Sequence, residues 1–287
     1  MSASATDLEA LGADVEWTDA EAAAAARVAA PAGGGRLAEF AEWLAGAQGR
    51  FPLTPPKRAR CVVVGQSSTA VAAVADSLGV GIRTLAGPDG ADGPDAVGAA
   101  VAAGIAAADD EIDSGADLVV LAVADSTAAS AVVVGLLAGV EPVALLPRGA
   151  DAIDTAAWIT RAEHLRDARR RVAELRGQPT QLLAAADGAA LATATGFLLR
   201  AVTRRTPMVL DGTCAVAAAL VCHHIQPRAG RWWRVADVSS DPVHTRASEE
   251  MGQRPMLDLG ITRGDGTAGL LALSVLLAAV TLAGPGQ

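Results

Sequence analysis

Residues 118–123 read LVVLAV, an uninterrupted apolar run that lies between Asp117 and the polar segment beginning at Asp125. A run this short and this rich in valine and leucine is typical of a strand that is buried on both faces, as strands are in parallel sheets. Further strands of the same kind are predicted at residues 61–64, 81–85, 142–146, 208–210, 233–238 and 256–259. The intervening segments are long enough for crossover helices. The sequence therefore predicts an α/β fold, a doubly wound, mostly parallel sheet with helices on both faces.

The start of the chain has a different character. Residues 1–30 are acidic and rich in alanine, Gly33-Gly34-Gly35 follow as a joint, and apolar side chains then recur at helical spacing from Leu37 to Ala47. We expect residues 1–60 to form a small helical N-terminal segment that packs on a main α/β domain of residues 61–287.

Composition limits the classes of function. Of the 287 residues, 51% are apolar but only 3% aromatic, and the formal net charge is −9. A protein that binds nucleic acid needs a basic face to replace the counterions of the phosphates, so we expect no nucleic-acid partner. The three cysteines are expected to be reduced thiols.

Two further observations bear on location. The first 16 residues lack the basic and then apolar pattern of a secretory signal. The longest apolar run, residues 268–283, is shorter than the roughly 20 residues that span a bilayer, so we expect a buried helix there. The prediction is a cytoplasmic protein with no membrane partner.

In a doubly wound sheet, ligands bind at the carboxyl ends of the strands. Two loops with a carboxylate follow predicted strands, and each admits two interpretations. In Gly264-Asp265-Gly266-Thr267, Asp265 is either a general base or the cap of the apolar helix that follows. In Leu210-Asp211-Gly212-Thr213, Asp211 either holds a ribose or base, or caps the helix that begins near Thr213.

Other polar clusters favour structural roles. Ser126 and Thr127 follow a strand and suit either a phosphate or a helix cap. The run 239–244 (SSDPVH) lacks the surroundings of a hydrolase triad, so helix capping is favoured there. Cys214, Cys222 and the two histidines at 223–224 lack the spacing of a zinc site, and we predict no metal. The arginine-rich segment 161–176 is interpreted as a solvated helix face.

The order of these loops resembles a known family, the nicotinate-nucleotide:dimethylbenzimidazole phosphoribosyltransferases of cobalamin assembly. Residues 204–212 (RRTPMVLDG) resemble its strand ending in Asp-Gly, 240–244 (SDPVH) its Ser-x-Glu-Pro-Gly-His loop, and 257–259 with 263–267 (LDL and RGDGT) its Leu-Asp-Leu and Gly-Glu-Gly-Thr run. Upstream, 35–45 with Gln48, 115–120 and 141–144 follow its framework. The resemblance covers roughly residues 31–283.

The resemblance implies a phosphoribosyltransferase-like domain and a group transfer. The phosphoribosyl group of nicotinate mononucleotide would move to a benzimidazole-type aromatic base, without a cofactor or metal, and Asp265 would take the proton of the incoming base. It implies a substrate site formed by residues of several loops: Ser126, Thr127, Gly149, Asp211, Gly212, Gly264, Gly266 and Thr267. It also implies a homodimer.

Several ligand loops depart from the family pattern. Asp265 stands where the family has glutamate, and the segment from Ala124 to Thr127 replaces a glycine-rich phosphate loop. Residues 65–68, 148–151 and 187–190 also differ from the loops that they would replace. A second hypothesis is therefore a catalytically inactive paralogue that binds a ligand or pairs with a related transferase as a partner subunit. The sequence leaves both hypotheses open.

Overall fold

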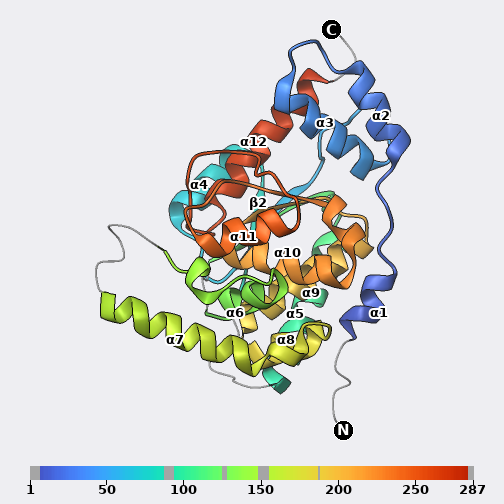
Figure 1. Ribbon diagram of the computed structural model, residues 1–287. Coiled ribbons are helices and arrows are strands. Elements are labelled where there is room, and N and C mark those ends of the chain that lie inside the picture. Colours follow the sequence, from blue (N-terminus) through green and yellow to red (C-terminus); the bar gives the residue numbers. More distant parts are fainter. Residues whose placement is uncertain (1–6, 87–93, 125–127, 148–154, 187, 284–287) are drawn as a thin grey trace.

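A computed structural model describes residues 7–86, 94–124, 128–147, 155–186 and 188–283 (Figure 1). Within these residues, five strands form one parallel sheet in the order β2-β1-β3-β4-β5. The strands are β1 (Ala59–Val64), β2 (Gly81–Leu85), β3 (Leu118–Val123), β4 (Met208–Asp211) and β5 (Trp233–Val235). The apolar run at residues 118–123 is thus the central strand, and all six of its side chains are buried.

Side chains alternate between the two faces of the sheet, and each face has its own core. Val62, Leu121 and Leu210 belong to the core under α5 (Pro94–Asp113), α6 (Ala128–Leu137), α9 (Ala189–Thr203) and α10 (Thr213–Ile225). Val63, Val120 and Val209 belong to the core under α3 (Gly35–Gln48), α4 (Thr69–Ser77) and α12 (Thr267–Leu282). Helices therefore cover both faces, and the prediction of a doubly wound α/β fold is confirmed.

The remaining elements lie around these layers. They are α1 (Leu8–Ala13), α2 (Ala20–Ala29), α7 (Thr155–Arg171), α8 (Pro179–Ala186), α11 (Pro242–Glu250) and the 3-10 turns η1 (Pro142–Leu145), η2 (Ala173–Leu175) and η3 (Pro227–Arg231). Helix α7, which carries most of the arginine-rich segment, runs along the periphery in Figure 1 and buries mainly Leu165. It is the solvated helix that its composition predicted.

Two predicted strands are wrong. Residues 142–145 form η1, because β3 pairs directly with β4 and leaves no place for a strand between them. Residues 256–259 contribute only an isolated bridge between Asp237 and Leu257. Beyond that bridge, the N–H of Leu259 donates to the Asp237 carboxylate instead of to a strand. Strand β5 also ends early, at Val235, three residues before its predicted end.

The long apolar run near the end of the chain forms α12, which packs into the core that it shares with α3 and α4. None of the helices in the described ranges is long and apolar enough to cross a membrane. Helix α3 ends at Gly49, which adopts a left-handed conformation. The division of the chain near residue 60 stays a prediction.

Candidate active site

A cavity of about 370 Å³ opens at the carboxyl end of the sheet. It is lined by Gln66, Ser67 and Ser68, which follow β1, and by Arg263 and Asp265, which precede α12. The sheet order changes direction between β1 and β3, and ligands of doubly wound folds bind at such a point. The cavity therefore lies where the fold class places a ligand.

Asp265 is held by three contacts and is only 6% exposed. Its Oδ1 accepts hydrogen bonds from the N–H of Thr267 at 3.1 Å and from the Thr267 hydroxyl at 2.6 Å. Its Oδ2 lies 2.9 Å from Nε of Arg263, in ion-pair range but without hydrogen-bond alignment. Asp265 thus caps the first turn of α12 through one oxygen, while the other oxygen has an ion pair as its sole polar contact in the described structure.

Asp211 lies at the end of β4 and is 1% exposed. Its Oδ2 accepts a hydrogen bond of 3.0 Å from the N–H of Gly269, in the first turn of α12, and its Oδ1 is buried without a partner among the described residues. Helix α10, which follows it in sequence, has no side-chain cap at Gly212. Asp211 therefore caps a helix that lies far from it in the sequence, and of its two interpretations the cap of its own helix is wrong, while the contact with a ribose or base stays a prediction.

The environment of Asp211 disfavours its charge. Burial raises the pKa of Asp211 to about 6, the N–H groups of the α12 terminus oppose this rise, and the nearby Asp265 carboxylate adds to it. Burial also raises the pKa of the Cys61 thiol, which lies beneath the same loop, to about 12. Two carboxyl groups thus share this site, and Asp211 binds a proton near pH 6.

The glycines of the two loops allow a close backbone approach. A Cβ on Gly212 would lie 2.6 Å from Cα of Gly264, and a Cβ on Gly264 would lie 2.4 Å from the carbonyl oxygen of Val123. Both glycines also have positive φ, 93° and 62°. Side chains are excluded at both positions, so the end of β4 and the loop before α12 meet directly beside the end of β3.

The segment 239–244 has the capping role that its composition favoured. Asp241 caps α11 by accepting a hydrogen bond from the N–H of Val243 at 2.9 Å, and it accepts a second from the Thr213 hydroxyl at 2.7 Å. The bond from the Thr213 hydroxyl ties α11 to the start of α10. Burial lowers the pKa of His244, which lies in the first turn of α11.

The sequence prediction missed two residues of the site, Asp237 and Ser67. Asp237 follows β5 and accepts hydrogen bonds from the N–H groups of Leu259 and Ile261, both at 2.7 Å, so it shapes the loop that leads to Asp265. Ser67 has a buried hydroxyl oxygen without a partner in the described structure and lines the cavity. The place of Ser67 in the loop after the first predicted strand was an available signal, whereas Asp237 fell inside the strand predicted at 233–238 and had none.

The predicted base Asp265 and five of the residues predicted to form the substrate site converge at the carboxyl end of the sheet: Asp211, Gly212, Gly264, Gly266 and Thr267. Ser126, Thr127 and Gly149 lie outside the described residues, and they stay predictions. Cys61, Cys214 and Cys222 are buried. Within the described parts of the chain, no three metal-binding side chains gather into a possible metal site.

Comparisons with known proteins agree with this architecture. A family model described as Phosphoribosyltransferase matches residues 93–284. Among solved structures, the crystal structure of CobT from Thermus thermophilus superposes with a TM-score of 0.80 at 24% identity, covering 92% of this chain and 96% of that one. This likeness shows that the two chains share a fold.

Curated relatives are similar over nearly the whole chain. The nicotinate-nucleotide–dimethylbenzimidazole phosphoribosyltransferase of Streptomyces avermitilis is 35% identical over 92% of this chain and 85% of its own length. The protein of the same name from Mycobacterium avium is 36% identical over 93% of each chain. The chain therefore belongs to the nicotinate-nucleotide–dimethylbenzimidazole phosphoribosyltransferase family.

Proposed function

We propose that this chain transfers the phosphoribosyl group of nicotinate mononucleotide to a benzimidazole-type base, and that Asp265 accepts the proton released from that base. The observation that carries the proposal is the Asp265 carboxylate, which lines the cavity at the carboxyl end of the sheet. The names of the relatives supply the two substrates.

The proposed reaction is a single displacement at C1′ of the ribose. A ring nitrogen of the base forms a bond to C1′, the bond from C1′ to the nicotinate nitrogen breaks, and nicotinate leaves with that electron pair. The other ring nitrogen of the base then loses its proton to Asp265. Such proton acceptance is worth about 10²–10⁴ in rate when the acceptor is positioned.

The contacts of Asp265 suit this role. Oδ1 is fixed by the two donors of Thr267, which holds the carboxylate in one orientation. Oδ2 is buried and has only the ion pair with Arg263, whose own side chain is 67% exposed. One oxygen is thus anchored, and the other accepts no hydrogen bond in the described structure and is the one that we assign to the proton.

Asp211 has a different part in the proposal. It is buried and binds the first turn of α12, so it positions the loop that carries Asp265. Its unpartnered Oδ1 is the atom that we assign to a substrate polar group. The phosphate is assigned to Ser126 and Thr127, by their place after β3, and Gly149 is assigned to the same substrate site.

A turnover assay tests the proposal. Purified protein is incubated with nicotinate mononucleotide and dimethylbenzimidazole, and nicotinate and the new nucleotide are separated by chromatography. We expect equal amounts of both products, loss of both on omission of dimethylbenzimidazole, and loss of both in Asp265→Ala. The matched control is Asp76→Ala, which removes an exposed carboxylate of α4 and is expected to leave turnover unchanged. Folded protein that forms neither product would contradict the proposal and favour the inactive paralogue.

Pairing of two chains is a separate proposal. A homodimer is implied by the family, and pairing with a related transferase is its alternative. Light scattering of the purified chain measures its mass, for which we expect twice the monomer value.

A further inference from the structure

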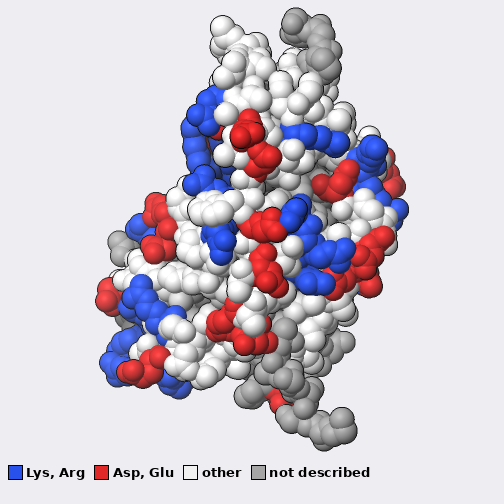
Figure 2. Space-filling model, turned by 90° about the vertical axis from the view of Figure 1, so that its right-hand side faces the viewer, with Lys and Arg blue, Asp and Glu red and all other residues white. Residues whose placement is uncertain are grey.

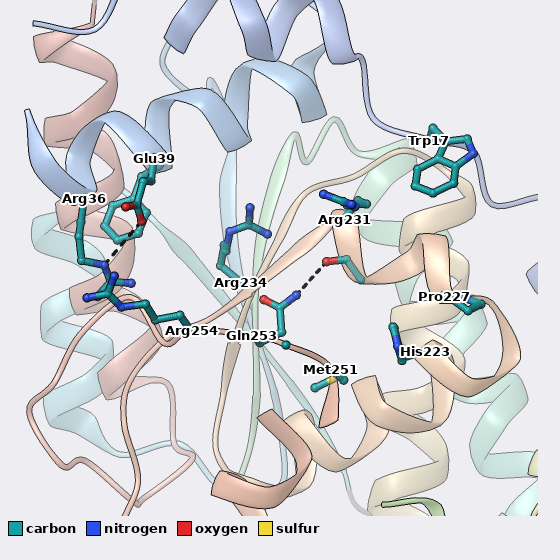
Figure 3. Close-up of a pocket in the computed structure, with 13 residues that line it drawn as sticks. Trp17, Arg36, Glu39, His223, Pro227, Arg231, Arg234, Met251, Gln253 and Arg254 are labelled. Atoms are coloured by element: carbon teal, nitrogen blue, oxygen red, sulfur yellow. Dashed lines mark hydrogen bonds and ion pairs between the residues drawn. The ribbon is translucent and has the colours of Figure 1, made fainter. Parts of the chain in front are cut away.

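A second cavity lies beside β5, which contributes Arg234 to its wall (Figure 3). Its volume is about 540 Å³, within the range of cavities that hold small organic ligands. Its wall comes from the first turns of α3, from η3 and β5, and from the segment that follows α11. It shares no lining residue with the cavity at Asp265.

The charge of this cavity is opposite to that of the chain. Four arginines line it, Arg36, Arg231, Arg234 and Arg254, against one carboxylate, Glu39. In the close-up, Arg36 and Arg254 lie side by side below Glu39, and Arg234 lies between them and Arg231 (Figure 3). By contrast, basic and acidic side chains are interleaved over the molecular face drawn in Figure 2. A chain of net charge −9 thus concentrates positive charge in one hollow.

Three of the four arginines have no carboxylate partner among the described residues, and the fourth, Arg36, lies 3.9 Å from Glu39. Among the described residues Arg231, Arg234 and Arg254 form no ion pair, whereas Arg60 is bound to Glu111 at 2.6 Å and Arg200 to Asp109 at 2.8 Å. The neighbouring carboxylate Glu42 is already paired with Arg27. The cavity therefore contains several guanidinium groups without counter-charge.

Arg234 shows what this arrangement costs. Its guanidinium donates to the carbonyl of Trp233 and lies 5.0 Å from the centre of the Trp43 ring. Burial lowers the pKa of Arg234 to about 10, and the nearby Arg231 contributes to this fall. A bound anion would favour the charged form of Arg234, because it supplies the missing counter-charge.

Two buried nitrogens in the same wall also lack hydrogen-bond partners among the described residues. Nε of Arg36 donates no hydrogen bond and lies 3.9 Å from Glu39, while the other nitrogens of Arg36 donate to the carbonyls of Pro255 and Met256. Nδ1 of His223 is buried and likewise makes no hydrogen bond in the described structure. Buried polar atoms are rarely left unsatisfied in native proteins, and Nε of Arg36, which can only donate, indicates a ligand with an acceptor oxygen, while Nδ1 of His223 can donate or accept.

We propose that the cavity between Arg36, Arg234 and Arg254 is a second ligand site, distinct from the transfer site, and that it binds the phosphate group of a small phosphate ester. Guanidinium groups bind phosphate oxygens in pairs of parallel hydrogen bonds, and a dianionic phosphate matches the excess of positive charge. The volume leaves room for an organic group beside Trp17, whose ring is 63% exposed and lies 6.0 Å from Arg231. An aromatic group would stack there.

The test is a calorimetric titration at constant ionic strength with two probes, inorganic phosphate and adenosine monophosphate. The wild-type chain is compared with Arg254→Gln, an exposed residue whose replacement leaves the core intact. The matched control is Arg246→Gln on α11, which removes the same charge from an exposed arginine that does not line the cavity and is paired with Glu249.

We expect both probes to bind, Arg254→Gln to weaken binding about tenfold, as the loss of one charge-assisted hydrogen bond does, and Arg246→Gln to change it less than about twofold. Turnover at saturating substrates should be equal in all three proteins. Tighter binding of the nucleotide than of phosphate would place its organic part in the cavity, and equal binding would restrict the site to the phosphate group.

The proposal is overturned if neither inorganic phosphate nor adenosine monophosphate binds. Equal weakening in both variants would also overturn it, because the effect would then report net charge. A third result would also overturn it: the chain binds no phosphate, and Arg254→Gln changes its mass in light scattering. A protein partner would then occupy the cavity.

Discussion

The substitution Asp211→Asn tests the electrostatics of the site. Asp211 is 1% exposed, and its pKa of about 6 lies above the ordinary value of 3.8 because burial disfavours the charged form. The folded chain therefore holds this proton more tightly than the unfolded chain does. The contribution of Asp211 to stability is greatest below about pH 4, falls as the pH rises from about 4 to about 6, and is constant above that range.

The magnitude follows from the two pKa values. Each unit is worth about 1.4 kcal/mol, so the charged Asp211 costs on the order of 3 kcal/mol at neutral pH. Asparagine retains an oxygen for the N–H of Gly269 but loses the favourable interaction of a carboxylate with the α12 terminus. We therefore expect Asp211→Asn to raise the free energy of unfolding by about 1–2 kcal/mol at about pH 7.5.

The assay is urea unfolding of both proteins at several pH values between about 4 and 8, a range that contains the fall between about pH 4 and 6 and the constant part above it. The gain should shrink toward the acid end, where Asp211 is protonated in the wild type. The control is Asp237→Asn at the end of the next strand, where both carboxylate oxygens accept N–H bonds at 2.7 Å. That change should destabilise by about 1–3 kcal/mol, because an amide offers only one acceptor. If Asp211→Asn destabilises as much as Asp237→Asn at neutral pH, the reasoning is refuted.

Two other expectations concern the packing of the site. Gly264→Ala brings a Cβ within 2.4 Å of the Val123 carbonyl oxygen, whereas Gly79, where φ is also positive, has open space around it. We therefore expect Gly264→Ala to lower the free energy of unfolding by about 1–3 kcal/mol more than Gly79→Ala does. Thermal unfolding of both variants measures the difference, and equal losses would disprove the clash. Cys61 and Cys222 are buried, and burial raises the pKa of both thiols. We therefore expect mass spectrometry to find both unmodified after treatment with iodoacetamide at about pH 7.5, and modified once urea is added. Rapid labelling of the native chain would contradict their placement.

The sheet was predictable because burial leaves a simple signature. The bounds of β2 and β3 match the prediction, and those of β1 and β4 differ by two residues or fewer, since each is a short apolar run. The 142–146 run has the same composition but contains η1. It was mistaken for a strand because local composition does not say which segments pair in the sheet. Pairing is a long-range property, and no single segment encodes it.

The site was predictable in position but not in detail. Asp211 and Asp265 were expected at loop starts, yet both bind the same helix, α12, and neither of the two interpretations that the sequence offered for Asp211 included this distant helix. The role of Asp237 depends on a loop that returns more than 20 residues later. The arginine cavity joins α3, η3, β5 and the segment after α11, so no spacing in the sequence could reveal it.

The central claim is that Asp265 is a proton acceptor and not only a helix cap. Asp265→Asn separates the two roles, because asparagine caps a helix as well as aspartate does but cannot take a proton from the base. The measurement is the rate of nicotinate release with nicotinate mononucleotide and dimethylbenzimidazole, together with the unfolding free energy of the same sample. We expect stability within about 0.5 kcal/mol of the wild type and a rate at least about 100-fold lower. An Asp265→Asn chain that is as stable and nearly as fast as the wild type would contradict the claim and leave Asp265 as a cap alone.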